Sequence, residues 1–283
     1  MASKKRRIAR RKIKGKKHRH ALFIIFLIVV ATFFLHKEFS KDSFQQKKDL
    51  RSKIAKPAQP EEKQGTLPKV AVVIDDLGSS KKAAIKALRI NAPITLSILP
   101  QETYSRWIAV QGHGLGHDVI GHIPMEAIKP HKLGKGGLYT WMDEDEILAT
   151  LEEDFNSIPH IKGISNHMGS AFTKDERAMS VVISWVNEHG LFFLDSLTVS
   201  GSAGIRLAQE KGVRAIKRDI YLDNNDSPEY LEAQWNKLVK IAGERGYAIA
   251  LAHPGENTIE FLKKAIPVSK IKVVPLSELV IIP

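Results

Sequence analysis

Carboxylate and imidazole side chains follow short apolar runs of this 283-residue sequence, at points where strands are expected to end. The residues at these points are Asp75 and Asp76, His122 and Glu126, Asn166 and His167, Asp195, Asp219, and His253. Aspartate, glutamate and histidine supply the oxygen and nitrogen ligands of zinc and similar divalent cations. A cation of this kind acidifies bound water, and an unligated carboxylate beside it can take the proton. The residue types therefore indicate a hydrolytic metal site.

Each of these residues, taken singly, also has a structural interpretation. Asp75 or Asp76 is a favoured N-cap for the helical segment that begins near Ser80. A lone histidine at a strand end is more often a hydrogen-bonded structural residue than a ligand, and Asp195 and Asp219 are also typical of caps or salt bridges. Two adjacent carboxylates after a buried strand are costly unless they are paired, hydrogen-bonded or bound to a cation. Their coincidence with histidines at successive strand ends favours the metal site.

The elements that must position these side chains alternate between strand-like and helical runs. The strand-like runs span residues 70–74, 95–98, 118–122, 163–165, 191–194, 215–216, 248–252 and 272–274. The helical runs span residues 80–89, 143–158, 174–188, 202–209, 228–242 and 258–265. This alternation predicts an α/β fold of parallel βαβ units that closes, or nearly closes, into a β/α barrel, with a doubly wound open sheet as the alternative. Both folds gather functional side chains where strands end and loops begin.

The charge of the chain is unevenly distributed. The formal net charge is +12, but residues 1–20 hold 11 of the 43 Lys and Arg and no acid. The other 263 residues carry 32 basic and 31 acidic side chains, so we expect no nucleic-acid partner for the body of the protein. The basic arm is interpreted as an orientation signal and a contact for anionic lipid rather than a nucleic-acid site. The absence of cysteine excludes disulfides, thiolate zinc sites and a cysteine nucleophile.

A fifteen-residue uncharged run, Ala21–Leu35, follows the basic arm. Because basic flanks stay in the cytoplasm, we predict a cytoplasmic arm over residues 1–20 and an uncleaved transmembrane signal anchor over residues 21–36. A cleaved signal peptide is the main alternative, although no small-x-small site follows the run, and a cytosolic protein with a buried helix is another. Residues 37–68 are predicted to be a flexible linker. Residues 69–283 would then be a folded domain on the periplasmic side of the inner membrane, anchored by a single pass.

Six short motifs surround the candidate residues. They are VVIDDLG with Asp75, GHIPME with His122, NHMGSAFT with His167, FFLDS with Asp195, RDIYLDN with Asp219 and AHPG with His253. Together they resemble the divergent polysaccharide deacetylases, relatives of the NodB-type carbohydrate esterases, over nearly all of residues 69–283. The resemblance implies a distorted or incomplete (β/α) barrel that removes N- or O-acetyl groups from sugars with a metal-bound water. It implies a hydrolase of carbon–nitrogen bonds other than peptide bonds.

The resemblance also implies roles for single residues. Asp75 matches the catalytic base and Asp76 the metal-binding aspartate of the first motif. His122 matches the first histidine of a His-x-x-x-His metal motif, and Glu126 stands where the second histidine would be. A carboxylate can still ligate zinc, so Glu126 stays a candidate ligand. His167 lies where the superfamily has an Arg-Pro motif, and it is a candidate replacement ligand.

The remaining roles concern the leaving group and the substrate. His253 matches the general-acid histidine that protonates the leaving amine, with Asp195 or Asp219 to orient it. Asn166, Asp195 and Asp219 are candidate substrate-binding residues. The implied cofactor is a divalent metal ion, zinc first, and the implied partner is a glycan of the cell envelope.

Two functions follow from these motifs. The first is a membrane-anchored, metal-dependent hydrolase that deacetylates an envelope glycan. The second is an inactive barrel that binds an envelope glycan or protein, because the second and third motifs are altered. Trp107, Tyr139 and Trp141 are candidates to stack on sugar rings, or else belong to the core. The Gly- and Lys-rich segment 129–140 is a candidate substrate-side flap or an ordinary surface loop.

Overall fold

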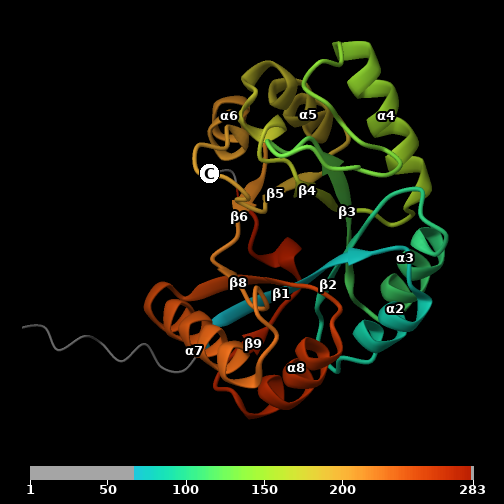
Figure 1. Cartoon of the computed structure of the whole chain (residues 1–283). Coiled ribbons are helices and arrows are strands. Elements are labelled where there is room, and N and C mark those ends of the chain that lie inside the picture. The colour runs from blue at the N-terminus through green and yellow to red at the C-terminus, as the bar shows by residue number, and fades with distance from the viewer. Residues whose placement is uncertain (1–66, 282–283) are drawn as a thin grey trace, which may run out of the picture. The chain divides into compact units, whose positions relative to one another are not determined.

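Parallel strands form one curled sheet in the computed structural model, which describes residues 67–281 (Figure 1). The strands are β1 (Lys69–Leu77), β2 (Thr95–Ile98), β3 (Asp118–Met125), β4 (Gly163–Met168), β5 (Phe192–Asp195), β6 (Ala215–Lys217), β7 (Ile220–Tyr221), β8 (Tyr247–Ala252) and β9 (Lys272–Val273). Each strand expected from the sequence is present, and β7 is an addition that the sequence pattern did not predict.

The order of the strands decides between the two predicted architectures. Neighbours in the sheet run β6-β5-β4-β3-β2-β1-β8-β7, and β9 pairs with the start of β1. A doubly wound sheet would reverse direction at a switch point, whereas this order follows the chain around a ring. Within residues 67–281 no pairing joins β6 to β7, so the ring stays open there. The fold is therefore the predicted incomplete (β/α) barrel, and the doubly wound alternative is wrong.

Helices follow most strands and cover the outside of the sheet (Figure 1). They are α2 (Lys81–Leu88), α3 (Ser105–Gly114), α4 (Glu144–Ser157), α5 (Glu176–Glu188), α6 (Gly204–Lys211), α7 (Pro228–Arg245) and α8 (Glu256–Val268), with 3-10 turns at Phe172–Lys174 and Leu276–Glu278. All helices expected from the sequence form. The additional helix α3 was not predicted; it contains two glycines, and its N-cap residue makes no side-chain hydrogen bond.

Capping side chains begin the predicted helices. Ser80 accepts a hydrogen bond from the Ala83 amide at the start of α2. Asp143 and Glu146 form a reciprocal capping box at the start of α4. Because Ser80 supplies the cap of α2, the interpretation of Asp75 or Asp76 as that cap is wrong, and the two carboxylates need another explanation.

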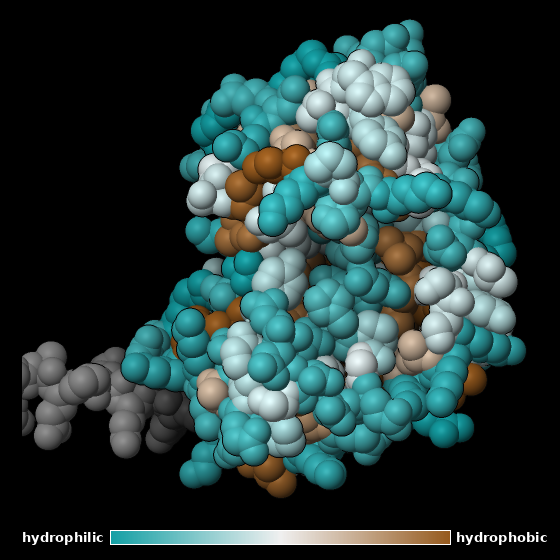
Figure 2. Space-filling view, viewed as in Figure 1, coloured by the Kyte–Doolittle hydropathy of each residue, from teal (hydrophilic) through white to brown (hydrophobic). Residues whose placement is uncertain are grey.

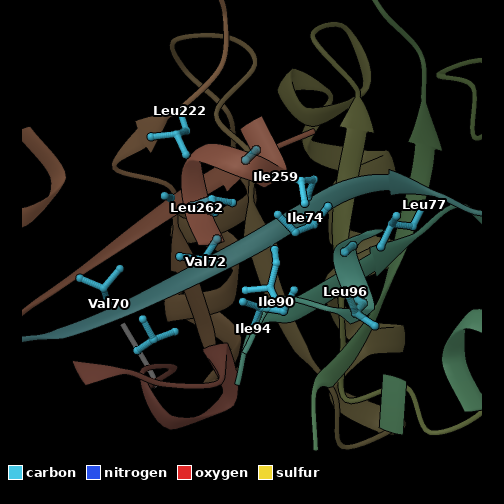
Figure 3. Packing of buried hydrophobic residues seen from close by; sticks show 14 of the residues in the cluster. Val70, Val72, Ile74, Leu77, Ile90, Ile94, Leu96, Leu222, Ile259 and Leu262 are labelled. Atoms are coloured by element: carbon cyan, nitrogen blue, oxygen red, sulfur yellow. The ribbon is translucent and has the colours of Figure 1, made fainter. Parts of the chain in front are cut away.

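Alternate residues of β1 face opposite sides of the sheet and so divide the core. Val70, Val72 and Ile74 pack outward against helices (Figure 3). Val73 belongs instead to the inner cluster of the barrel. The same alternation directs Asp75 inward. The first motif therefore places a carboxylate in the barrel interior, next to a fully buried strand.

A buried carboxylate also lies outside the barrel, on α4. Asp154 Oδ1 accepts a hydrogen bond from Gln101 Nε2 at 2.8 Å, and Oδ2 has no hydrogen-bond partner among the described residues. A Cβ on Gly136, whose φ is +69°, would lie 2.1 Å from Asp154 Oδ1. The segment that the sequence analysis considered as a flap thus crosses α4 so closely that only glycine fits at this point.

Asp154 makes the stability of the protein depend on pH. Burial raises the pKa of its carboxyl to about 7. The folded protein then holds a proton that the unfolded chain releases above about pH 4, so this contribution is complete at low pH and is lost as pH rises through 7. Because of Asp154, the unfolding free energy of the unsubstituted protein is expected to fall by at most about 4 kcal/mol between pH 4 and 8. This fall is expected to be absent in Asp154→Asn. Urea unfolding at several pH values measures it, with the exposed Asp145→Asn on the same helix as control; an unchanged pH dependence in Asp154→Asn contradicts the assignment.

The membrane-related predictions fall mainly on residues that the structure does not describe. The predicted arm (1–20), the anchor (21–36) and nearly all of the linker (37–68) lie outside residues 67–281. None of the helices within 67–281 combines the length and apolar character that crossing a bilayer requires. In the view of Figure 2 the surface of this part is mainly hydrophilic, and hydrophobic residues appear in small patches.

Candidate metal centre and active site

Three ligand atoms converge at the carboxyl ends of β1, β3 and β4. Asp76 Oδ1 lies 2.8 Å from His167 Nδ1 and 3.2 Å from His122 Nε2, and the two ring nitrogens are 3.3 Å apart. They form the one group of three or more metal-ligating side chains within 67–281. β3 and β4 are neighbours in the sheet and β2 lies between β3 and β1, so the fold brings together residues separated by up to 91 positions in sequence.

A bulge at the end of β1 explains how two adjacent aspartates serve one site. The pairing of β1 with β2 shifts register between Ile74 and Leu77, and Asp76 has a φ of +56°. In a regular strand neighbouring side chains point to opposite faces, so only Asp75 would face inward. The left-handed backbone at Asp76 turns its side chain back toward the two histidines. Such a conformation costs on the order of 1–3 kcal/mol for a non-glycine residue, and it is typical of functional sites.

His122 is held by residues on the neighbouring strands. Its Nδ1 is hydrogen-bonded to Ser165 Oγ at 2.7 Å, and Ser165 Oγ lies 3.0 Å from Ser97 Oγ. All three side chains are buried. This fixes the ring with Nε2 directed at Asp76, in the way that outer partners orient metal-binding histidines. Ser97 and Ser165 carry no charge and were not singled out from the sequence.

The geometry of this group fits a divalent cation. Asp76 Oδ1 is buried and within contact of two nitrogens, yet no N–H is directed at it along a hydrogen bond. Tetrahedral zinc with bonds of about 2.0–2.1 Å to nitrogen and oxygen separates its ligands by about 3.3 Å. The three measured separations, 2.8, 3.2 and 3.3 Å, are close to that value. The donor set of two imidazoles and one carboxylate is that of a catalytic site with one position open.

Asp75 lies beside this group with a free oxygen. Its side chain is 2% exposed, Oδ1 is 3.7 Å from His122 Nδ1, and the same oxygen makes no hydrogen bond within the described part of the chain. Burial raises the pKa of Asp75, and the nearby His122 offsets this in part. Burial also acts on Asp76, but the close His122 and His167 rings outweigh it and lower the pKa of that carboxyl. The two adjacent aspartates thus differ: Asp76 is a permanent anion, whereas Asp75 has a higher proton affinity.

His253 lies on the other side of the group, after β8. Its Nδ1 is 3.0 Å from Asp223 Oδ1, and Asp223 Oδ2 accepts hydrogen bonds from the His253 amide and from the Thr258 hydroxyl. The hydrogen bond with Asp223 raises the pKa of His253 to about 9, against the effect of burial. His253 Nε2 lies 3.7 Å from Asp76 Oδ2. The raised pKa favours the protonated form of His253, whose second nitrogen faces Asp76 of the metal-ligating group.

The residue that orients His253 differs from the two expected from the sequence. Asp219 precedes β7, where it accepts hydrogen bonds from the Ile249 amide and from Arg245, at the opposite end of β8 from His253. Asp195 accepts from the Leu197 amide and from Ser202 Oγ. Neither contacts His253, so their assignment to that role is corrected to Asp223.

The three candidate substrate-binding residues make structural contacts. Asn166 and Asp195 are 1% exposed, and their polar atoms serve the backbone and side chains around the ends of β4 and β5. Asn166 is the neighbour of His167 on a strand and faces the opposite side of the sheet. The contacts of Asp219 are also structural, and within residues 67–281 no hydrogen bond joins any of the three residues to the metal-ligating group, so their role in substrate binding stays a prediction.

Glu126 does not join the metal-ligating group. Its Oε2 accepts hydrogen bonds from the Thr140 amide at 2.7 Å and the Thr140 hydroxyl at 2.6 Å. Four residues of strand separate positions by about 13 Å, so Glu126 is too far along β3 to share an ion with His122. The assignment of Glu126 as a ligand is therefore corrected: it fastens the segment after β3 to the sheet. His167, on the next strand, stands where the missing histidine was expected to act.

One aromatic side chain of the rim lies next to His253. The ring of Tyr221 stacks with the His253 ring at 6.2 Å between centroids, and the guanidinium carbon of Arg218 lies 3.8 Å from the centroid of the Tyr221 ring. Burial and the carboxylates of Asp75 and Asp76 raise the pKa of Tyr221 to about 12. Tyr221 therefore stays a neutral phenol beside the site. The sequence motif contains Arg218, Tyr221 and Asp223, but only the pairing of β7 with β8 shows that they reach it.

Comparison with known proteins gives the family. The sequence pattern of the divergent polysaccharide deacetylases matches residues 72–280, which include every residue of the site. The chain belongs to this family. The match confirms the resemblance seen in the six motifs, and it agrees with the incomplete barrel that the strand order shows.

Similar proteins occur in Escherichia coli and Haemophilus influenzae. The uncharacterized protein YibQ of Escherichia coli (strain K12) is 33% identical over 198 residues, which are 70% of this chain and 62% of that protein. A protein of Haemophilus influenzae is 33% identical over 195 residues, 69% of this chain and 70% of that protein. The present chain thus spans less than two thirds of the Escherichia coli relative. The crystal structure of uncharacterized protein ATU2773 from Agrobacterium tumefaciens C58 has a TM-score of 0.73 at 22% identity, covering 76% of this chain and 90% of that one, which shows a shared fold.

Proposed function

We propose that this divergent polysaccharide deacetylase is a metal-dependent hydrolase that removes acetyl groups from amino sugars of a cell-envelope glycan. The observation that carries the proposal is the convergence of Asp76, His122 and His167, with the buried Asp75 carboxyl and the His253 imidazole in contact with this group. Membership of the family supports carbohydrate deacetylation as the reaction class. The proposal also places the domain in the periplasm, because an uncharged run follows a basic arm in the sequence.

Asp76, His122 and His167 would hold the cation. Two imidazoles and one carboxylate suit zinc among the common divalent metals. When bound, such a cation acts as a Lewis acid on the acetyl carbonyl and lowers the pKa of water. The hydrogen bond from Ser165 to His122 keeps that ring in position for ligation.

Asp75 and His253 divide the proton transfers between them. Asp75, with its raised pKa and free Oδ1, takes a proton from the attacking water, whose oxygen bonds to the acetyl carbon. His253, charged through its contact with Asp223, gives its proton to the sugar nitrogen as the carbon–nitrogen bond breaks. Acetate and the free amine are the products. Asp75 contacts His122, and His253 contacts Asp76, so the base and the acid both lie next to the group that would hold the cation.

The metal content of the purified full-length chain tests the proposal. We expect close to one zinc or similar ion per chain by elemental analysis, lost in Asp76→Ala and in His122→Ala. Glu126→Gln is the matched control, since its carboxylate contacts Thr140 and lies outside the ligand group. A metal-free protein after divalent cations are added back, with no acetate released from N-acetylated oligosaccharides, would favour the binding-only alternative.

A further inference from the structure

A hollow of about 470 Å³ lies beside the metal-ligating group at the same end of the barrel. Ala127, Ile128, Lys129 and His131, which follow β3, form one wall. The others are formed by Met168 at the end of β4, by Ser170 after it, and by Thr198 and Val199 after β5. Its volume is in the range of pockets that bind small molecules. Met168 directly follows the ligand His167 in the chain, so the hollow and the metal-ligating group share the end of β4.

Hydrogen bonds between the walls hold the hollow in shape. The Ile128 amide donates to Ser170 Oγ at 2.9 Å, and the Thr198 hydroxyl donates to the Met168 carbonyl at 2.8 Å. These contacts join the segments after β3, β4 and β5. Met168 has a φ of +53°, which places its side chain away from the continuation of β4. The hollow is thus built from three strand ends rather than from one exposed loop.

The chemistry of the walls combines apolar and cationic groups. Ala127, Ile128, Met168 and Val199 offer apolar contact, which suits the C–H faces of a sugar ring, and Lys129 and His131 lie at the edge. From residue 127 to residue 142 the sequence contains three lysines and no acid. The ion pairs between described residues do not include Lys129 or Lys132, and both are exposed. A cationic edge with no internal partner attracts an anionic ligand.

We propose that the hollow binds a carboxylate-bearing sugar unit of the same glycan whose acetylated unit lies at the metal-ligating group. The inference rests on the proposed function and makes its substrate an acidic glycan. The carboxylate is drawn to Lys129 in the wall of the hollow and to the exposed Lys132 three residues further along the same segment, while the sugar ring packs on the apolar walls. A neutral glycan would leave these lysines without a partner and is bound less tightly.

Calorimetric titration with two oligosaccharides tests this inference. The probes are a hyaluronan tetrasaccharide, which alternates glucuronic acid with N-acetylglucosamine, and the neutral chitin tetrasaccharide. The full-length Asp75→Asn protein is used so that binding is measured without turnover. We expect the acidic probe to bind about tenfold more tightly at low salt, with the difference reduced as salt is raised. Equal affinity for the two probes, or no binding of either, overturns the inference.

Three variants locate the binding. Lys129→Gln with Lys132→Gln is expected to abolish most of the preference, whereas Lys237→Gln with Lys240→Gln, the same charge change on α7, keeps it. Val199→Phe fills the hollow and is expected to weaken binding of the acidic probe. A preference that survives the first pair or falls equally in the α7 control contradicts the assignment to this hollow.

The outcomes separate the inference from the proposed function. Acetate release and metal content measured on the unsubstituted protein test the function alone. Acetate release from both oligosaccharides at equal efficiency, without any binding preference, leaves the function in place and rejects the acidic glycan. A lysine-dependent preference without metal or acetate release supports an acidic-glycan-binding barrel and rejects the hydrolase.

Discussion

Replacing Asp75 by Asn is expected to lower the rate of deacetylation by about 100- to 10,000-fold, the usual range for loss of a general base. The amide keeps the size of the carboxyl and cannot take a proton from water. Asp75 is 2% exposed and lies 3.7 Å from His122. A side chain in such a packed position is best replaced by one of the same size and shape, as asparagine is. Because Asp75 is not one of the three converging ligands, metal content is expected to stay near that of the unsubstituted protein.

Measurements of turnover, metal content and stability on the same preparations identify the role of Asp75. Acetate release reports turnover, elemental analysis reports the metal, and urea unfolding reports the fold. Asp76→Asn is the informative comparison, since it is expected to lose both turnover and metal. Full turnover in Asp75→Asn would exclude this residue as the base, and loss of metal in Asp75→Asn would make it a ligand instead.

Much of the barrel follows from the sequence because its signals are local. Apolar runs of four or five residues indicate most strands, and residues such as Ser80 and Asp143 indicate the starts of helices. Helix α3 escaped prediction because its two glycines weaken the helical pattern. Strand β7, only Ile220–Tyr221, is too short to show any alternation, and it exists because β8 lies beside it.

The sequence predicted those parts of the candidate site that depend only on which residues lie at the ends of strands. The gathering of Asp76, His122 and His167 follows from parallel strands whose carboxyl ends share one rim. The assignment of Glu126 failed because spacing taken from a motif ignored the rise along an extended strand. The prediction that Asp195 or Asp219 orients His253 was wrong for a different reason. Identifying Asp223 requires knowing that the residues after β7 lie beside the end of β8, which is a property of pairing rather than of sequence.

The arrangement of the site also bears on the choice between an enzyme and an inactive barrel. A protein that only bound glycan would have no need of a strained backbone at Asp76, which costs on the order of 1–3 kcal/mol. Nor would it need the Asp223 carboxylate, which accepts hydrogen bonds from the His253 ring, the His253 amide and the Thr258 hydroxyl. In the second motif Glu126 stands in place of a metal-ligating histidine, and His167 on the neighbouring strand supplies an imidazole instead. The site therefore still has three candidate metal ligands. These features favour the hydrolase.

Asp223→Asn is expected to move the alkaline limit of activity to lower pH. Asp223 raises the pKa of His253 to about 9, and a general acid works only while it is protonated. Activity that depends on His253 is therefore present below that pKa and is lost as pH rises through it. Without the carboxylate, the pKa of the imidazole returns toward its ordinary value of about 6.5, so activity at pH 8 falls by about 30-fold and changes little at pH 5.5.

The difference between the two pH profiles isolates the contribution of Asp223, since any bound cation acts on both proteins alike. Asp226→Asn serves as the control, because that carboxylate is exposed in the same loop and contacts Asn257 rather than His253. The rate of acetate release between pH 5 and 10 measures both limits. A uniform loss at every pH would mean that Asp223 only holds the loop in place, whereas a shift confined to the alkaline limb means that it sets the acidity of His253. That outcome would assign the proton for the leaving amine to His253 in its charged form, as the proposed reaction requires.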